Sequence, residues 1–453
     1  MSHWKAQFDN LIAPAVAKSA VTKHLIIDRG AITHVGEVAA SVTSSQRAIL
    51  FADRAGFDAA GYATRDQLVS AGFAVDQLIL NDEPLPKASV EEAEPFIETL
   101  KSDPLLLPVS VGSGVINDLV KFASYETNRQ YVSVATAASM DGYTSAGAPL
   151  ARDGFKVTIP TRAPMALIAD LDVIAKAPAE MTGWGYGDLA GKSPAGGDWL
   201  LAELVGAEVR DATAWPLVQD HLRGWLCDPQ ALAHGDRDAT ARLFIGLTAV
   251  GFAMEFHGSS RPASGADHQI AHMWEMEDLS LEGRKVSHGA AVAVGCVVTL
   301  ALYDWLLGQD LSQIAGPAPD LNAALDELRR VIPDTRIADR AVLQTQEKWI
   351  DPALHADRLK RICTHWQDTR GIIRQQLFRT GEMVAMLKMA GAPAFAKDIG
   401  VSSVHLERTI RAAAYIRSRY TILDFLKETG LFERALSEVL PKLDQLAAHG
   451  GKI

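Results

Sequence analysis

The first half of the chain alternates short runs of aliphatic and β-branched residues with stretches of helical pattern. We expect strands in a set of six such runs, at 24–28, 47–53, 76–81, 105–112, 131–136 and 156–161. Strands that alternate with helices form βαβ units, in which successive strands pair in parallel. The pattern therefore predicts an α/β region with a mostly parallel sheet of five or six strands.

The second half of the chain is expected to be helical. After about residue 177, apolar residues recur with a period near 3.6 and β-branched runs disappear. Helices are expected at 198–204, 240–256, 265–279 and 289–307, with several amphipathic ones after residue 319, and the Gly-Pro-Ala-Pro segment 316–319 indicates a linker. We expect an α/β domain at 1–177, an all-α domain at 178–316, and a helical C-terminal region at 317–453 that continues the second domain.

Composition and charge exclude several kinds of partner. The 453 residues are 48% hydrophobic, which is enough to form a sizeable core in two or three domains. The net charge of -11 argues against nucleic acid and anionic membranes as partners. An anionic substrate would therefore need a local cationic pocket.

Cysteine usage and hydropathy indicate the compartment. Cys227, Cys296 and Cys363 lie far apart with no CxxC spacing, so neither a disulfide framework nor a cysteine zinc site is expected. The apolar stretch 290–303 is shorter than the ~20 residues of a membrane span, and Asp304 follows it. It is expected to be a buried core helix. The N-terminus carries no apolar export signal, and a cytoplasmic protein with no membrane span is predicted.

A glycine turn follows the expected strand at 105–112. Gly112 and Gly114 flank Ser113, and an apolar helix comes next. Such a turn lets backbone N–H groups and a helix N-terminus approach a pyrophosphate closely. The motif is not GxGxxG, because Asn117 stands at the last position, and a tight turn that binds no ligand remains an alternative. The next strand ends in the hydroxyl-rich segment 136–145, which would lie at the same carboxyl edge of the sheet, where ligands of α/β proteins bind.

Asp53 ends an earlier strand. At this position a carboxylate often binds the ribose of a dinucleotide, and it could equally be a helix N-cap. The adjacent Arg54 could accommodate a 2′-phosphate, so the sequence does not decide between NAD and NADP as cofactor.

Histidine spacing suggests a metal site. Ser264 and Asp267 are spaced as a capping box at the start of a helix, on which His268 and His272 then face the same way. His288 opens the apolar helix, and Asp188 ends the glycine-rich segment 183–188. Such donors suit Zn²⁺, Ni²⁺ or Fe²⁺. Each histidine alone is more often structural, and spacing does not bring Asp188 near His288.

Five motifs in order carry a family resemblance: VGSGVINDLVKF, VATAASMDGYTSAGAPL, GWGYGDLAGK, RPASGADHQIAHMWEME and the Ser287-His288-Gly289 turn. Over roughly residues 24–307 the chain resembles the bacterial sn-glycerol-1-phosphate dehydrogenases, within the group of iron-containing alcohol dehydrogenases, glycerol dehydrogenases and dehydroquinate synthases. The resemblance implies a dehydroquinate synthase-like fold with the active site in a cleft between two domains. It also implies an oxidoreductase that uses NAD or NADP and one divalent ion (Zn, Ni or Fe) to interconvert dihydroxyacetone phosphate and sn-glycerol 1-phosphate.

The resemblance also implies site residues. Besides Asp53 and Gly112, the implied dinucleotide contacts are Gly114, Val115, Ile116, Asn117, Asp118, Thr136, Ala137, Ala138, Ser139 and Ser145. The implied metal ligands are Asp188, His268 and His288. The implied substrate contacts and catalytic groups are Asp141, Asp188 and His272. No site is carried beyond residue 317, where archaeal members do not match closely.

The expected chemistry divides these roles. His272 or water would protonate the nascent alkoxide, and Asp141 would position a substrate hydroxyl, while a metal-bound Asp188 stays ionised. Arg261 and Lys192 are candidates for binding the phosphate, although both could be solvated surface charges.

Three alternatives remain open on sequence alone. A glycerol or polyol dehydrogenase would act on unphosphorylated substrate. A dehydroquinate synthase-like lyase would turn over without net oxidation of NADH, but such relatives have glutamate where Asp188 stands. A metal-binding scaffold would have lost catalysis. The apolar helical half favours a homo-oligomer, a dimer or larger.

Overall fold

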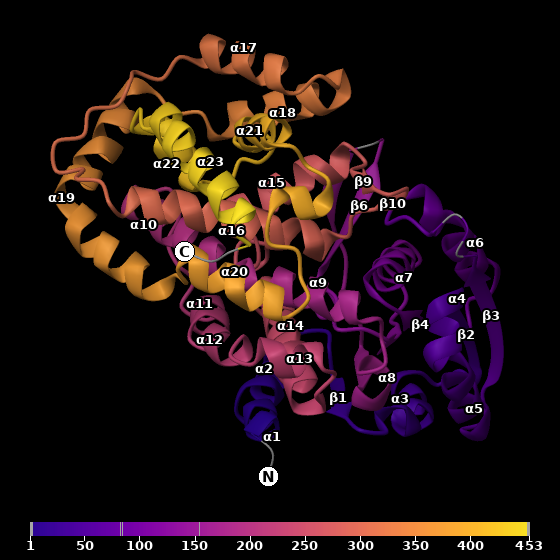
Figure 1. The fold of residues 1–453 in the computed structure, drawn as a ribbon. Coiled ribbons are helices and arrows are strands. Elements are labelled where there is room, and N and C mark those ends of the chain that lie inside the picture. The colour runs from indigo at the N-terminus through magenta and orange to yellow at the C-terminus, as the bar shows by residue number, and fades with distance from the viewer. Residues whose placement is uncertain (1–2, 82, 84, 154, 451–453) are drawn as a thin grey trace. The chain divides into compact units, whose positions relative to one another are not determined.

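The computed structural model describes residues 3–81, 83, 85–153 and 155–450. Within these residues the chain forms two compact units, each built from two separate stretches of sequence. The first unit comprises 1–185 and 224–260, and the second comprises 186–223 and 261–453. The polypeptide therefore passes three times from one unit to the other (Figure 1).

The first unit contains a six-stranded parallel sheet with the order β1-β8-β5-β4-β2-β3. Its strands are β1 (His24–Asp28), β2 (Arg47–Asp53), β3 (Ala74–Leu80), β4 (Leu106–Gly112), β5 (Val132–Ala135) and β8 (Ala166–Asp170). Its helices are α1 (His3–Gln7), α2 (Ala13–Lys18), α3 (Val35–Val42), α4 (Arg54–Gly56), α5 (Tyr62–Ser70), α6 (Glu94–Ser102), α7 (Gly114–Glu126), α8 (Leu171–Ile174), α13 (Pro229–Ala233) and α14 (Arg237–His257).

Both faces of the sheet are covered by helices, because side chains alternate along each strand. Leu50 of β2 packs in a core with Val38 of α3 and Leu68 of α5. Its neighbour Phe51 packs on the opposite face with Phe96 of α6. This alternation gives three layers, helix, sheet and helix, as the strand pattern predicts.

Five of the six expected strands lie in the sheet, and one expectation is wrong. The segment expected at 156–161 is β7 (Phe155–Pro160), which pairs antiparallel with β6 (Gly147–Arg152) in a separate hairpin. The sixth strand of the sheet is β8, whose five residues are all buried. A strand of five residues that are all buried, four of them apolar, shows no alternation, which is why periodicity does not reveal it.

The second unit is helical apart from a short hairpin of β9 (Ser280–Leu281) and β10 (Arg284–Lys285). Its helices are α10 (Lys192–Leu204), α11 (Ala214–Gln219), α15 (Ala266–Met276), α16 (His288–Leu306), α17 (Leu321–Val331), α18 (Thr335–Lys348), α19 (Pro352–Gln376), α20 (Thr380–Met389), α21 (Ser403–Ala413), α22 (Ile422–Glu428) and α23 (Phe432–Ala448). Two helices cross a boundary between the units: α9 (Ala179–Ala190) and α12 (Leu222–Trp225). All four expected helices are present, and no helix or strand is assigned between α16 and α17, where a linker is expected.

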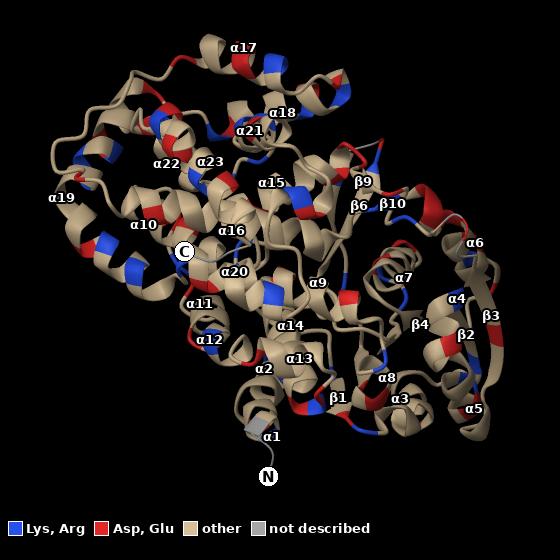
Figure 2. Cartoon of the chain, viewed as in Figure 1, with Lys and Arg blue, Asp and Glu red and all other residues tan. Residues whose placement is uncertain are grey.

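Two helices, α14 and α16, are long and apolar enough to cross a membrane by length and composition. Of their most apolar stretches, 83% and 89% respectively is buried within the protein. Figure 2 shows α16 almost without charged residues; its one carboxylate, Asp304, lies near the C-terminal end. The burial confirms the expected core helix at 290–303.

The units differ from the domain boundaries expected at 177 and 316. Residues 224–260, which include α14, belong with the sheet and not with the later helices. The hydroxyl of Thr144, in the loop after β5, donates to the carbonyl of Thr248 in α14 at 2.8 Å. Tyr143 also lies against Phe244, with ring centroids 5.6 Å apart. A helical pattern alone does not indicate which core a helix joins.

Candidate metal centre and cofactor loops

Three side chains of the second unit converge as a candidate metal site. Asp188 of α9, His268 of α15 and His288 of α16 each offer one donor atom, and these atoms lie within 4.8 Å of one another. His268 Nε2 is 3.5 Å from Asp188 Oδ1, and the imidazoles of His268 and His288 have centroids 5.3 Å apart. The structure brings together the three residues that the resemblance implies as ligands.

A carboxylate orients each of the two histidines. His268 Nδ1 lies 2.5 Å from Asp267 Oδ2, and His288 Nδ1 lies 2.5 Å from Glu275 Oε1. An ionised carboxylate only accepts hydrogen bonds, so each Nδ1 carries the proton and each Nε2 presents a lone pair. Histidine ligands of metals are typically held in this way. The donor set therefore fits a divalent transition metal ion.

Asp188 is held as a carboxylate by its surroundings. It is fully buried, and Lys192 Nζ, also fully buried, lies 2.6 Å from its Oδ1. Burial, the largest influence, raises the pKa of Asp188, but Lys192, His268 and His288 together hold this pKa well below its usual value. Asp188 is therefore suited to be a ligand and not a proton donor.

His272 stands beside this cluster. It lies one turn after His268 on α15, with ring centroids 6.0 Å apart, and its ring stacks on that of His288 at 5.8 Å. With Glu275 and His288 it forms a second group whose donor atoms lie within 4.8 Å. Because Glu275 bonds to Nδ1 of the shared His288, the Asp188 group is the better candidate for holding an ion, and the role of His272 stays a prediction.

Close helix packing makes the cluster possible. A Cβ atom on Gly295 of α16 would come within 2.3 Å of the Asp267 carbonyl oxygen, and one on Gly191 would come within 2.6 Å of Asp267 Oδ2. Both positions therefore require glycine for α15 to lie where its histidines meet Asp188. The capping role expected for Ser264 is not observed, because the N-cap of α15 is Gly265, whose N–H donates to Asp267 Oδ1 at 3.1 Å.

We predict that Asp267→Asn weakens metal binding by about 10- to 100-fold. Both oxygens of Asp267 accept, one from Gly265 N–H and the other from His268 Nδ1. An asparagine can accept on one side only, so its NH₂ group would favour the tautomer in which His268 Nε2 carries the proton and cannot ligate. Competition with a chelator of known affinity measures the change. Asp326→Asn, at an exposed position of α17, is the control and should bind like the parent; equal affinities for all three proteins would contradict the assignment.

In the first unit, the glycine turn and the hydroxyl-rich segment lie side by side. β4 and β5 are neighbours with Gly112 opposite Ala135, and Thr136 N–H donates to the Gly112 carbonyl at 3.1 Å. α7 begins at Gly114, so its first N–H groups open at the carboxyl edge of the sheet. This arrangement is the one in which α/β proteins bind a pyrophosphate. The expected contacts 114–118 and 136–139 thus share one edge.

Several residues implied as dinucleotide contacts have side chains that are buried or hydrogen-bonded to other protein groups. Asn117 Oδ1 accepts from the hydroxyls of Tyr131 at 3.3 Å and Ser133 at 3.0 Å. Ser145 Oγ lies 3.0 Å from the carbonyl oxygens of both Gly142 and Gly147, and Ile116 is fully buried. Any contact that these residues make with a dinucleotide must therefore use the backbone.

Lys121 organises this edge, and the sequence reasoning missed it. It is fully buried, and its Nζ lies 2.5 Å from the Gly142 carbonyl, 3.2 Å from Ser145 Oγ and 3.4 Å from Asp118 Oδ1. Burial lowers the pKa of Lys121, and Asp118 partly offsets this; burial raises the pKa of Asp118, and Lys121 partly offsets that. A lysine three residues after an aspartate in an otherwise apolar helix was the available signal.

Gly185 of α9 packs against the loop 136–139. A Cβ atom there would lie 1.8 Å from the Ala138 carbonyl oxygen, so backbone would have to move. We predict that Gly185→Ala lowers the free energy of unfolding by about 1–3 kcal/mol and weakens NAD(P)H binding. Denaturant unfolding and fluorescence titration with NADH measure the two effects.

The control for Gly185 is Gly371→Ala. Gly371 lies within helix α19, away from its ends, on the solvent-exposed side, and an added Cβ would meet nothing within 4 Å. This variant should be more stable than the parent by up to ~1 kcal/mol, because alanine is the better helix former. If Gly185→Ala were equally benign, the close packing of α9 on the loop would be refuted.

Two expected site residues of the first unit have defined places. Asp53 is the N-cap of α4, with its Oδ1 accepting from Gly56 N–H at 2.6 Å, so the capping alternative is confirmed and the ribose role stays a prediction. Asp141 lies in the loop between β5 and β6. Its negative charge attracts the positive charge of Lys121 and raises the pKa of Lys121. The role of Asp141 as a substrate contact also stays a prediction.

The structure does not support Arg261 as a phosphate ligand. Its side chain is 1% exposed, with Nη1 and Nη2 donating to the carbonyls of Tyr420 and Asp198 at 2.9 Å and Nε lying 3.1 Å from Glu208. Lys192 is likewise no surface charge, since it lies against Asp188.

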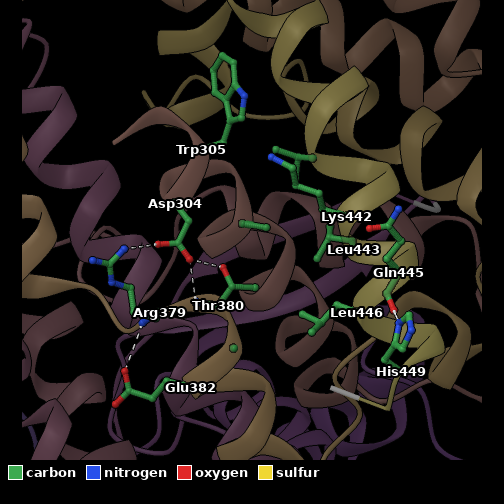
Figure 3. Close-up of a pocket in the computed structure, with 13 residues that line it drawn as sticks. Asp304, Trp305, Arg379, Thr380, Glu382, Lys442, Leu443, Gln445, Leu446 and His449 are labelled. Carbon is green, nitrogen blue, oxygen red and sulfur yellow. Dashed lines mark hydrogen bonds and ion pairs between the residues drawn. The ribbon is translucent and has the colours of Figure 1, made fainter. Parts of the chain in front are cut away.

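A cavity of about 810 Å³ lies among α16, α20 and α23 (Figure 3). At its edge Asp304 accepts a hydrogen bond from Thr380 Oγ1 at 2.7 Å and pairs with Arg379 at 3.2 Å. Asp304 is near the end of α16, whereas His288 begins it, so ~24 Å of helix separates the two. The cavity is therefore separate from the metal cluster.

Comparisons with known proteins agree with this geometry. Residues 26–178 match the family model described as iron-containing alcohol dehydrogenase. The chain is 29% identical over 384 residues to a glycerol-1-phosphate dehydrogenase (NAD(P)+) of Bacillus velezensis, covering 84% of this chain and 85% of that protein. It is 32% identical over 296 residues to the Methanothrix thermoacetophila enzyme of the same name, covering 65% of this chain and 81% of that protein.

Among solved structures, glycerol dehydrogenase from Schizosaccharomyces pombe has the same fold, with a TM-score of 0.58 at 15% identity over 94% of this chain and 92% of that one. The α/β unit and the helical unit are thus those of the glycerol dehydrogenases and iron-containing alcohol dehydrogenases, as the sequence predicts. Taken with the sequence relatives, these matches place the chain in the glycerol-1-phosphate dehydrogenase family.

Proposed function

We propose that this protein is a divalent-metal-dependent oxidoreductase that interconverts dihydroxyacetone phosphate and sn-glycerol 1-phosphate with NADH or NADPH. In the reducing direction NAD(P)H gives a hydride to C2 of the ketone, the C2 oxygen takes a proton, and NAD(P)+ is released. The observation that carries the proposal is the cluster of Asp188, His268 and His288, in which both imidazoles are turned by carboxylates to present Nε2. The substrate is proposed from the names of the sequence relatives.

Asp188, His268 and His288 would hold the ion, which when bound supplies a Lewis acid for a carbonyl oxygen. Lys192 keeps Asp188 ionised, and Asp267 and Glu275 fix the tautomers of the two histidines. Asp188 and His268 are buried, whereas the His288 side chain is 29% exposed, so the cluster is reached from the His288 side. These residues therefore keep the donor set ready before a substrate arrives.

His272 is the candidate proton donor to the C2 oxygen. It is on the same face of α15 as His268, and it lies within reach of the space that the three ligands border. Imidazole is the side chain best suited to exchange a proton near neutral pH. Asp141 is proposed to position a substrate hydroxyl.

The dinucleotide is proposed to bind at the carboxyl edge of the parallel sheet, with its pyrophosphate at the first turn of α7 and its ribose near Asp53. We further propose a homo-oligomer in a reducing cytoplasm. Cys227, Cys296 and Cys363 are all free thiols, which accords with that compartment.

The test is an absorbance assay at 340 nm with the protein loaded separately with Zn²⁺, Ni²⁺ and Fe²⁺. Dihydroxyacetone phosphate and unphosphorylated dihydroxyacetone are compared with each cofactor, and the enantiomer of the product is identified by a stereospecific enzyme. Metal-dependent oxidation of NAD(P)H that favours the phosphorylated ketone, with sn-glycerol 1-phosphate as product, is the expected result. Turnover of the unphosphorylated ketone alone would make the protein a polyol dehydrogenase.

A further inference from the structure

A loop of the C-terminal region carries two arginines and contacts the segment just before α15. The sequence Arg417-Ser418-Arg419-Tyr420 connects α21 to α22 within the second unit. Arg417 and Arg419 are both half-buried, so neither is sealed from solvent, whereas Arg261 beside them is enclosed by the protein. The loop therefore presents cationic groups that a small ligand can reach.

The loop is fixed to the start of α15, the helix that bears the ligand His268. Arg419 Nη1 donates to the Ser264 carbonyl at 2.8 Å, just before α15 begins, and the Tyr420 carbonyl accepts from Arg261 at 2.9 Å. At the other end of α15, Glu277 lies 2.7 Å from His405 of α21. Because α15 and α21 also pack together, the loop is held against the helix that bears His268 at both ends of that helix.

Each arginine interacts with a carboxylate that orients a ligand histidine. Arg417 is attracted electrostatically to Glu275, the partner of His288. Arg419 is attracted to Asp267, the partner of His268. Both arginines thus lie within electrostatic range of the carboxylates that orient the ligand histidines, and Arg419 also contacts the residues just before α15.

The positive charges of this group are crowded. Burial, followed by repulsion from Arg261 and Arg417, lowers the pKa of Arg419 to about 9, and burial also lowers the pKa of Arg417. Like charges held together in a partly buried place raise the free energy of the ligand-free protein. A dianion bound between them would relieve this repulsion, and guanidinium groups bind phosphate oxygens in pairs of parallel hydrogen bonds.

We propose that Arg417 and Arg419 bind the phosphate group of the substrate, an inference that rests on the proposed function. In dihydroxyacetone phosphate only a few bonds separate the phosphate from the C2 carbonyl. A carbonyl oxygen at the Asp188, His268 and His288 cluster therefore leaves the phosphate beside that cluster, where the loop lies. Specificity for a phosphorylated substrate is thus contributed by the C-terminal region, to which the sequence reasoning assigned no site.

The experiment compares kcat/KM for phosphorylated and unphosphorylated dihydroxyacetone in the metal-loaded parent and in Arg417→Gln. Loss of one partner of a partly buried charge pair corresponds to about a 100-fold fall in kcat/KM for the phosphorylated ketone. The value for the unphosphorylated ketone should stay within about threefold of the parent. Arg336→Gln is the control, because this arginine is exposed on α18 and pairs only locally with Asp334 at 3.0 Å. It should change neither value.

Two outcomes would overturn the inference. Equal losses on both substrates would mean that Arg417 only supports the metal site, and no loss on either would mean that it does not meet the phosphate. A parent protein with no preference for the phosphorylated ketone would instead refute the proposed function itself. Arg417→Lys, which keeps the charge but not the planar fork, provides a milder variant if Arg417→Gln does not fold, and it should lose part of the preference.

Inorganic phosphate gives a readout that does not depend on turnover. It should raise the midpoint of thermal unfolding of the metal-loaded parent and of Arg336→Gln, and this rise should be absent in Arg417→Gln. An equal rise in Arg417→Gln would place the phosphate elsewhere and overturn the inference.

Discussion

Replacing His268 with alanine is expected to lower kcat/KM by about 1,000-fold or more and to leave the protein folded. The change removes one of three metal donors. It also removes the hydrogen-bond partner of Asp267, whose Oδ2 lies 2.5 Å from His268 Nδ1. A site with two donors retains an ion poorly, and the catalysis that depends on the ion is lost with it. Metal content by mass spectrometry after dialysis, measured beside activity, separates loss of the ion from loss of the fold.

The control for this prediction is His365→Ala, at an exposed position of α19 in the same unit. It should keep both its metal and its activity. Full activity of metal-free His268→Ala would show that the three-donor cluster has no part in the reaction.

Replacing Lys121 with methionine is expected to lower the free energy of unfolding by about 3–5 kcal/mol. Methionine fills a similar volume but removes the lysine that pairs with the buried carboxyl group of Asp118 and the shortest of the hydrogen bonds to the Gly142 carbonyl, at 2.5 Å. Because this group joins α7 to the loop after β5, weaker binding of NADH should accompany the loss of stability. Urea unfolding and a fluorescence titration are the measurements.

Two further variants test whether the loss of stability comes from the buried ion pair. Lys101→Met, at an exposed position of α6, should change stability by less than about 0.5 kcal/mol. Adding Asp118→Leu to Lys121→Met should recover part of the loss, since an apolar pair of similar volume can replace a buried ion pair. A loss for Lys121→Met no larger than that for Lys101→Met would contradict the role assigned to the buried lysine.

The fold was predictable where a local pattern reports the environment of a segment. β1, β2 and β4 combine aliphatic content with clear ends, and α16 is too apolar to be anything but a core helix or a membrane span. β7 has the composition of a sheet strand, yet its partner β6 was not recognised, and pairing depends on contacts between distant residues. The place of α14 with the sheet follows from the same kind of contact, which a periodicity does not encode.

The sequence identified the candidate metal ligands but did not show how they are arranged in space. The order of motifs implied Asp188, His268 and His288, whereas their spacing in the sequence did not bring the aspartate near the second histidine. Glu275 could not be assigned a role from the sequence, because it acts through His288, which only the folded chain brings within reach. Lys121 had a local signal in Asp118, but its contact with the Gly142 carbonyl also depends on the fold. The phosphate residues first nominated had the right charge, but one of them is enclosed by backbone carbonyls.

The division of each unit into two stretches of sequence has a consequence during synthesis. The first unit needs α14, because Thr248 accepts from Thr144 and Glu255 accepts from Ser19 at 2.8 Å. Its core therefore cannot close until residue 257 has left the ribosome, when residues 186–223 of the other unit have already emerged and still lack α15 and α16. Residues 186–223 therefore remain without their packing partners until α15 and α16 have been synthesised. During this time the nascent chain is most exposed to aggregation and to binding by chaperones.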